Sequence, residues 1–205
     1  MNFWNEFKDE FKLDVLKEVG NIGAGHAATA LSRILNQPVD MSVPTVNLVP
    51  FEEIADRVGG SEQVVIAVFL RVEGDAPGNL FFIIREDSAK RLLRNLSIDS
   101  GEGAYSDLEL SALNEIGNIL AGSYLSSLAD FTKLTMTPTV PSLAIDMAGA
   151  ILSYGLLQFG RMGDAALLIE TKFLEDRDTV EGQFFLIPDP ESFGKIFRAL
   201  GVPGS

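Results

Sequence analysis

The pattern of apolar and polar positions along this chain runs through the same order of elements twice. Apolar residues recur three and four positions apart over 12–36 and again over 106–132, and this spacing predicts two long helices. Neither stretch contains a proline. Each is followed by a proline-bearing segment rich in Val and Thr, at 38–50 and 135–141, which predicts extended chain. The repeated order indicates an internal duplication.

The remainder of each half also follows one plan. A short helix is predicted at 51–58 and at 146–157. Two β-rich runs come next, "QVVIAVFLRVEG" with "GNLFFIIR" in the first half and "AALLIETKFLE" with "VEGQFFLIP" in the second. A last helix is predicted to close each half, over 86–97 and 189–200.

The two halves also share sequence. "EVGNIGAG" begins at Glu18 and "EIGNILAG" begins at Glu115, and six of the eight letters agree at an offset of 97 positions. "GNLFFI" and "GQFFLI" match at an offset of 104, after a small insertion. Residues from about 12 to 97 and from about 108 to 200 are therefore interpreted as two copies of one unit, joined by the link 97–107.

One copy alone has too little apolar residue content to build a stable core, so the two half-sheets are expected to merge. The short turns between the β-rich runs favour antiparallel pairing. The sequence thus predicts an α+β fold, internally duplicated with pseudo-two-fold symmetry. One largely antiparallel sheet of about six strands would be covered by helices, with residues 1–205 forming a single domain.

Composition narrows the classes of function. The 205 residues carry a net charge of −13, which argues against nucleic acid or an anionic membrane surface as partner. There is no cysteine, so disulfides, thiolate catalysis and zinc–cysteine sites are excluded. The charged start and the lack of a long apolar run predict no signal peptide and no membrane insertion. We expect a cytoplasmic protein.

The two long predicted helices share a polar stripe. Its members are Asp14, Glu18, Asn21 and Gly25 in the first copy and Ser111, Glu115, Asn118 and Gly122 in the second. One interpretation is the solvated face of an amphipathic helix. The repetition favours a functional one, because Asn and Gly are poor helix formers that a merely solvated face does not need. Gly25 and Gly122 would leave the helix bare beside each Asn, so that another surface could approach.

The residues of the stripe could form only part of a catalytic site, and a second molecule would have to supply the rest. The stripe has no nucleophile and no metal cluster, but an Asn amide can donate and accept hydrogen bonds at once and so hold a water at a set angle. Such positioning matters in phosphoryl hydrolysis. A Glu could bind a cation on the molecule that carries the phosphate. The single His26 has Ser123 opposite it in the second copy and is interpreted as a structural or surface histidine.

The spacing of these residues resembles a family signature. The pattern [DS]-x₃-E-x₂-N-x₂₂-P occurs twice, ending at Pro44 and at Pro141, and it is the signature of the CheC/CheX/FliY family of chemotaxis phosphatases. The resemblance implies hydrolysis of the aspartyl phosphate of the response regulator CheY. In those terms Asn21 and Asn118 orient the water, and Glu18 and Glu115 pair with a lysine of the regulator.

Further expectations follow from the same resemblance. The Mg²⁺ would be supplied by the phosphorylated regulator, and no cofactor would be bound by this chain. Asp14 and Ser111, at the first position of each signature, would contribute to binding the partner. CheC proteins also bind CheD, a receptor deamidase. The alternatives left open are a module that binds phosphorylated CheY or CheD without turnover, and a structural repeat that packs in an oligomer.

The two copies disagree in the short helix that follows the extended segment. Four charged residues of the first copy become uncharged at the offset of 97: Glu52, Glu53, Asp56 and Arg57 are replaced by Gly149, Ala150, Ser153 and Tyr154. Either the helix at 146–157 is buried more deeply, or it is an exposed apolar patch for a partner. In the second case Asp146 could imitate the side chain that CheD deamidates, without being deamidated itself.

Overall fold

A computed structural model describes residues 10–36, 38–43, 45–98, 101, 103–159, 165–175 and 178–200. Pro44, which ends the first signature, lies outside the described residues. The elements of the first copy are α2 (Glu10–Leu35), β1 (Asp40–Ser42), β2 (Val46–Pro50), η1 (Phe51–Glu53), α3 (Ile54–Arg57), β3 (Val64–Gly74), β4 (Gly78–Arg85) and α4 (Glu86–Asn95). Those of the second are α5 (Asp107–Thr132), β5 (Met136–Pro138), β6 (Ser142–Met147), α6 (Ala148–Phe159), β7 (Ala165–Glu175), β8 (Asp178–Pro188) and α7 (Pro190–Ala199).

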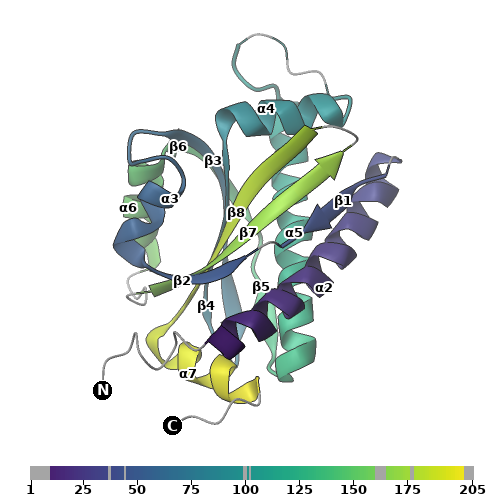
Figure 1. The fold of residues 1–205 in the computed structure, drawn as a ribbon. Coiled ribbons are helices and arrows are strands. Elements are labelled where there is room, and N and C mark those ends of the chain that lie inside the picture. Colours follow the sequence, from purple (N-terminus) through teal and green to yellow (C-terminus); the bar gives the residue numbers. More distant parts are fainter. Residues whose placement is uncertain are drawn as a thin grey trace.

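The predicted α+β fold with one antiparallel sheet is confirmed. The sheet follows the order β1-β7-β8-β4-β3-β5, while β2 also pairs with β7 and β6 also pairs with β3. All of these pairings are antiparallel. Because β1 with β2, and β5 with β6, each lie along one neighbour, the sheet is six strands wide (Figure 1).

The two copies exchange their edge strands. β1 and β2 of the first copy pair with β7 of the second, whereas β5 and β6 of the second copy pair with β3 of the first. In the middle of the sheet β4 pairs with β8, and Phe81 lies opposite Phe185, its own equivalent at the offset of 104. The pseudo-two-fold axis therefore passes through this pair, and neither copy can complete its sheet alone.

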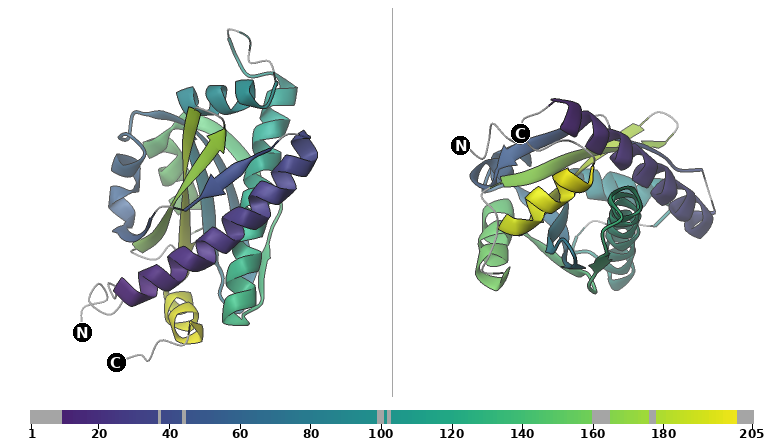
Figure 2. Two further views of the ribbon diagram at one scale, coloured as in Figure 1. Left: turned by 45° about the vertical axis from the view of Figure 1, so that its right-hand side comes forward. Right: turned by 90° about the horizontal axis from the view of Figure 1, so that it is seen from below.

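Helices cover both faces of the sheet. α2 and α5 lie side by side on one face, whereas α3 and α6 lie on the other (Figures 1 and 2). Alternation along β3 separates the two hydrophobic cores, because Ile66 and Val68 face the long helices while Val65 and Ala67 face the short ones. The apolar stripes of the long helices are thus fixed against the sheet, and their polar stripes point to solvent.

Both long helices end in the same way. Asn36 follows α2 with φ 52° and Lys133 follows α5 with φ 59°, and the two positions are equivalent at the offset of 97. A left-handed residue after a helix reverses the chain direction. The extended segments therefore run back along the helices that precede them. Only α5 has a capping box within the described residues, formed by Ser106 and Glu109.

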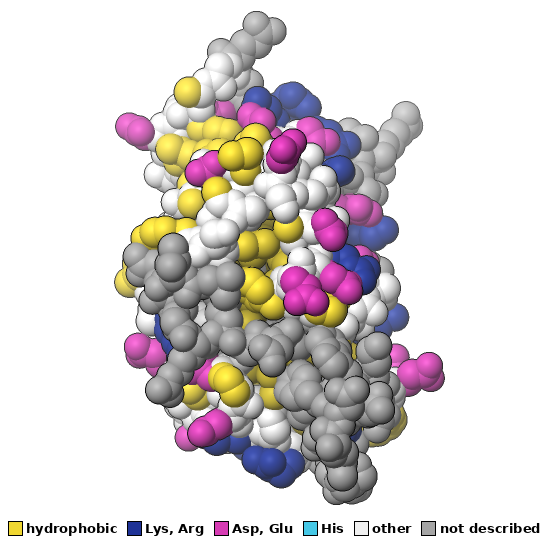
Figure 3. Space-filling model, turned by 90° about the vertical axis from the view of Figure 1, so that its left-hand side faces the viewer, with side chains coloured by type: hydrophobic (Ala, Val, Ile, Leu, Met, Phe, Trp, Pro, Cys, Tyr) yellow, Lys and Arg dark blue, Asp and Glu magenta, His cyan; other side chains and the backbone are white. Residues whose placement is uncertain are grey.

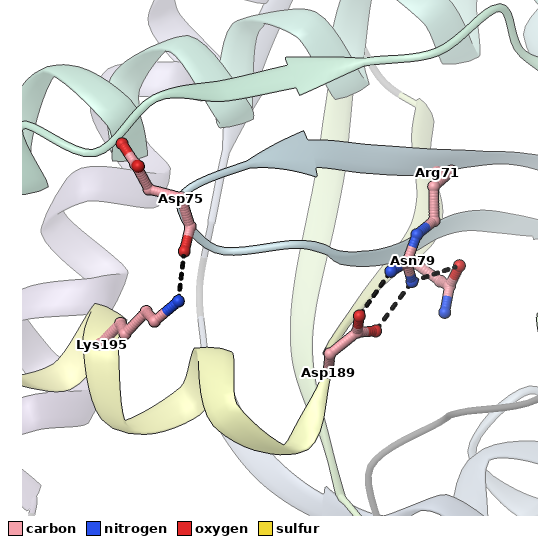
Figure 4. Close-up of polar contacts among 5 residues, drawn as sticks. All are labelled: Arg71, Asp75, Asn79, Asp189 and Lys195. Carbon is pink, nitrogen blue, oxygen red and sulfur yellow. Dashed lines mark hydrogen bonds and ion pairs between the residues drawn. The ribbon is translucent and has the colours of Figure 1, made fainter.

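The last helix is tied to the hairpin of the other copy. The guanidinium of Arg71 on β3 donates two hydrogen bonds to the carboxylate of Asp189, which precedes α7, and a third to Asn79 (Figure 4). Lys195 of α7 donates to the backbone carbonyl of Asp75 at 3.0 Å. These contacts cross from one copy to the other, so α7 joins the strand exchange in holding the copies together.

One predicted element is wrong in its bounds. The helix expected at 146–157 begins at Ala148 instead, and residues 142–147 form the edge strand β6. Asp146 lies on that strand, opposite Val65 of β3. The described ranges contain no helix with both the length and the apolar character needed to cross a membrane.

Candidate functional site

Three glycines of the long helices serve packing. A Cβ on Gly23 would lie 2.8 Å from the ring of Tyr124, where α2 and α5 cross, and a Cβ on Gly117 would lie 2.7 Å from Val68 of β3. A Cβ on Gly20 would meet Val43 at 3.4 Å. These glycines allow the helices to approach each other and the sheet, which accounts for their presence without any ligand.

The glycines of the polar stripe are different. A Cβ at Gly25 or at Gly122 would meet no atom within 4 Å. Their helical conformation requires no glycine either, since neither has a positive φ. The packing of this chain therefore does not explain these two glycines. They leave two positions without a side chain on the outer side of the helix pair.

The acidic members of the stripe, Asp14, Glu18 and Glu115, are exposed. Ser111, at the first position of the second signature, is exposed as well. Within the described residues, neither Glu18 nor Glu115 forms an ion pair, and neither side chain forms a hydrogen bond. Both carboxylates are therefore available to a cation on another molecule.

The first asparagine is held by the chain's own backbone. Asn21 is half-buried; its Oδ1 accepts a hydrogen bond from the Val43 N–H at 2.9 Å, and its Nδ2 donates to the Val43 carbonyl at 3.4 Å. The side chain thereby satisfies the backbone of Val43, at the break between β1 and β2. The prediction that the Glu and Asn are both exposed neighbours is therefore wrong for Asn21, which belongs to a local hydrogen-bond network.

The second asparagine is not held in this way. Asn118 is also half-buried, but its side chain makes no hydrogen bond with any described residue. Val140, the equivalent of Val43 at the offset of 97, is 88% exposed, whereas Val43 is 1% exposed. At the equivalent break between β5 and β6 of the second copy, a different side chain bonds the backbone. The hydroxyl of Thr139 accepts a hydrogen bond from the Arg71 N–H at 3.0 Å.

These contacts explain part of the signature. In the first copy the residue before the signature proline is the one that the asparagine side chain contacts. The constant spacing of 22 positions between the asparagine and the proline thus corresponds to a physical contact across the helix and the returning strand. Val43 was not singled out from the sequence, although this fixed spacing is a signal that could have found it.

The crossing of the helices is rigid and largely uncharged. The Tyr124 hydroxyl lies 3.0 Å from the Thr171 hydroxyl of β7, and burial raises the pKa of Tyr124 to about 12. His26 is exposed, with its Nδ1 3.5 Å from the Ser127 hydroxyl across the crossing. It is a surface histidine in contact with the neighbouring helix.

The described residues of the site are not arranged to bind a metal or to activate a nucleophile. The described part of the chain contains no group of three or more His, Asp or Glu side chains arranged to hold a metal ion. The stripe offers three carboxylates, those of Asp14, Glu18 and Glu115, and two amides, those of Asn21 and Asn118. Such groups can bind a cation and orient a water, and they need a reactive group from a second molecule.

The other candidate residue lies on the opposite face of the sheet. Asp146 is exposed, and its Oδ1 accepts a hydrogen bond from the Met147 N–H at 2.7 Å. The neighbouring Ile145 and Met147 are also exposed, but they point to the other face of the sheet, because Ile145 pairs with Ile66 of the core under the long helices. On the face that carries α3 and α6, α6 exposes Tyr154. The described side chains of α6 therefore keep an exposed side, and the deeper burial considered from the sequence does not apply to them.

Comparison with known proteins agrees with this duplicated arrangement. The sequence profile of the CheC-like family matches residues 11–48 and 108–145, once in each copy. A Bacillus subtilis protein named CheY-P phosphatase CheC is 42% identical over 208 residues, which cover 98% of this chain and 99% of that protein. The chain belongs to the CheC-like family.

Other similar proteins match this chain less closely. The flagellar motor switch phosphatase FliY of Bacillus subtilis is 35% identical over 124 residues, which are 58% of this chain and 32% of that longer protein. The crystal structure of Thermotoga maritima FliY superposes with a TM-score of 0.70 at 21% identity, covering 95% of this chain and 98% of the other. The FliM middle domain of H. pylori gives a TM-score of 0.64 at 12% identity, covering 93% and 99%. These two structures establish a shared fold.

Proposed function

We propose that this protein hydrolyses the aspartyl phosphate of the response regulator CheY. The observation that carries the proposal is the pair of exposed Glu and half-buried Asn side chains that both copies place on one side of the crossed helices. The relatives named CheY-P phosphatase CheC and flagellar motor switch phosphatase FliY support it. Phosphorylated CheY, a cytoplasmic signalling protein, would bring the phosphate, and its own Mg²⁺ would neutralise the developing charge.

In this proposal the asparagines orient the attacking water. The amide of Asn118 can accept a hydrogen bond from a water at Oδ1 and donate one from Nδ2, so it can set the angle of attack without changing charge. The amide of Asn21 can orient a water in the same way once its two hydrogen bonds to the Val43 backbone are broken. The rate gain comes from orientation, which can lower a barrier by about 7–11 kcal/mol when geometry is ideal.

The glutamates would bind the partner. Glu18 and Glu115 are exposed and form no ion pair with a described residue, so their role is to pair with a cation of CheY. Asp14 and Ser111 lie about one helical turn away on the same stripe and would add further polar contacts.

The test is phosphate release from phosphorylated CheY. A variant carrying Asn21→Ala and Asn118→Ala should lose turnover by at least about a hundredfold, because water positioning is lost in both copies. Binding of phosphorylated CheY should persist, since the glutamates remain. A double variant that still released phosphate at the parent rate would exclude this mechanism. A parent protein that binds phosphorylated CheY without releasing phosphate would instead be a non-catalytic module.

A second function is favoured by the exposed side chains on the face of the sheet that carries α3 and α6. Figure 3 shows hydrophobic side chains on this side of the molecule, where Tyr154 of α6 is 51% exposed and Asp146 of β6 is exposed. We propose this face as the binding site for the deamidase CheD, with Asp146 as a contact. Asp146→Lys should abolish CheD binding and leave phosphate release intact. Unchanged CheD binding would rule out Asp146.

A further inference from the structure

The exposed apolar residues of the two long helices are repeated between the copies. Phe11 and Leu108 are equivalent at the offset of 97 and are 62% and 69% exposed, and Ile34 and Phe131 are equivalent and are 61% and 49% exposed. Single exposed apolar side chains are ordinary on protein surfaces. Repetition in both copies selects these two pairs, and their position relative to the glutamates distinguishes one pair from the other.

Phe11 and Leu108 lie on the polar stripe. Each is seven residues before the glutamate of its copy, which places it about 20° from that glutamate around the helix and about 10 Å along it. Four residues after each glutamate there is an isoleucine, Ile22 or Ile119, about 6 Å further along the same side. Ile22 is 45% exposed, and Ile119 is half-buried. Each glutamate is therefore bracketed by two apolar side chains.

The other repeated pair lies elsewhere. Ile34 and Phe131 are 16 residues after the glutamates, about 160° around the helix and in the last turn, next to the left-handed residues that end α2 and α5. Both repeated pairs lie near helix ends, and what separates them is the side of the helix: Phe11 and Leu108 lie on the side of the glutamates, whereas Ile34 and Phe131 lie on the far side. They are matched controls, because they are apolar, exposed to a similar degree and carried by the same helices.

We propose that Phe11 and Leu108, with Ile22 and Ile119, are apolar anchors that determine which response regulator docks on each copy. The proposal rests on the proposed phosphatase function and deepens it. The preferred regulator surface would carry a cation between two apolar patches, about 10 Å and 6 Å away on either side. An anchor of this kind supplies affinity that a single exposed ion pair does not.

Charge identifies the occupant as a partner protein instead of a second copy of this chain. The stripe of α2 carries Asp14 and Glu18, and that of α5 carries Glu115, while the whole chain has a net charge of −13. Two such stripes placed face to face would repel each other. A surface with a lysine or arginine at its centre would be attracted, and its apolar rim would cover the anchors.

The experiment compares two double variants of the full chain. Phe11→Ser with Leu108→Ser should raise the KM for phosphorylated CheY about tenfold and leave kcat within about twofold, because the anchors bind ground and transition states alike. Ile34→Ser with Phe131→Ser should leave both constants unchanged. Leu108→Met with Phe11→Met should restore the parent KM. If the double variant fails to fold, the single variant Leu108→Ser, in the exposed first turn of α5, tests the same prediction.

The outcomes separate the two proposals. A parent protein without phosphate release contradicts the proposed function, and titration of phosphorylated CheY against the parent and Leu108→Ser then still tests docking. An unchanged affinity and KM in the anchor variants would overturn the inference, as would an equal loss in the control variants. A change of oligomeric state in place of regulator binding, seen by sedimentation, would assign the anchors to contact between copies of this chain and would also overturn it.

Discussion

The two copies of the signature differ in what their asparagines do in the absence of a partner. In the first copy the amide of Asn21 is bonded at both ends to the backbone of Val43, which is 1% exposed. In the second copy Asn118 makes no hydrogen bond with a described residue, and the equivalent Val140 is 88% exposed. The same residue type thus holds the chain between β1 and β2 in one copy and makes no hydrogen bond with a described residue in the other.

The difference arises from how the helices sit on the sheet. Gly20 of α2 approaches Val43 in the edge segment, whereas its equivalent Gly117 of α5 approaches Val68 in β3, one strand further in. α5 therefore covers less of the sheet edge, and the residues around Val140 are left outside the core. Duplication has kept the spacing of the site while the packing beneath it has diverged.

The largest expected effect is a difference between single asparagine variants. Asn118→Ala should lower phosphate release by about tenfold or more, whereas Asn21→Ala should lower it by about twofold at most, because Asn21 must first give up two hydrogen bonds to orient a water. Initial rates with phosphorylated CheY measure both. Equal losses in the two variants would show that the contact with Val43 opens readily when the partner binds.

Stability should show the reverse order. Asn21→Ala leaves the buried Val43 N–H without its acceptor, and an unsatisfied buried donor costs about 1–3 kcal/mol in the free energy of unfolding. Asn118→Ala removes no hydrogen bond to a described residue and should change stability by no more than about 0.5 kcal/mol. Urea denaturation of the two variants checks this. A comparable destabilisation by Asn118→Ala would mean that its amide also holds the fold.

Much of this arrangement could be predicted from the sequence. The long helices, both hairpins and the closing helices follow from apolar periodicity and from the repeat, because these elements bury one face against the sheet. Strand β6 was not predicted, and its last two residues, Asp146 and Met147, were placed in the following helix, since "SLAIDM" is short and contains residues that also favour helices. Its strand conformation comes from pairing with β3, a contact between copies that local sequence does not encode.

Helical spacing is sufficient to predict that both glutamates are exposed, and the structure confirms this for Glu18 and Glu115. The half-burial of both asparagines and the difference between their contacts could not be predicted in this way. The contact between Asn21 and Val43 joins residues 22 positions apart through the turn after α2. Whether such a contact forms depends on how deeply a helix sits on the sheet, which involves side chains from both copies.

The glycines allow a sharper comparison within one helix. Gly117→Ala would place a Cβ 2.7 Å from Val68, and such overpacking costs about 1–3 kcal/mol. Gly122→Ala meets open space and should stabilise α5 by about 0.5–1 kcal/mol. If the bare position serves close approach of CheY, Gly122→Ala should nevertheless slow phosphate release several-fold. A stabilised variant with the parent rate would show that the partner does not approach α5 at this position.

The smallest expected effect concerns the glutamates. Glu115→Gln keeps the size of the side chain and removes its charge, so an exposed ion pair with CheY would lose about 0.2–1 kcal/mol. The KM should rise by about 1.4- to fivefold at low salt, with kcat unchanged. The difference from the parent should shrink as ionic strength rises, because salt screens exposed charges. Glu18→Gln should have a smaller effect on KM if the first copy contributes less turnover. Steady-state phosphate release at two salt concentrations tests both variants. A fall in kcat at constant KM would assign Glu115 to the chemical step, and a salt-independent loss would place its partner out of reach of solvent ions.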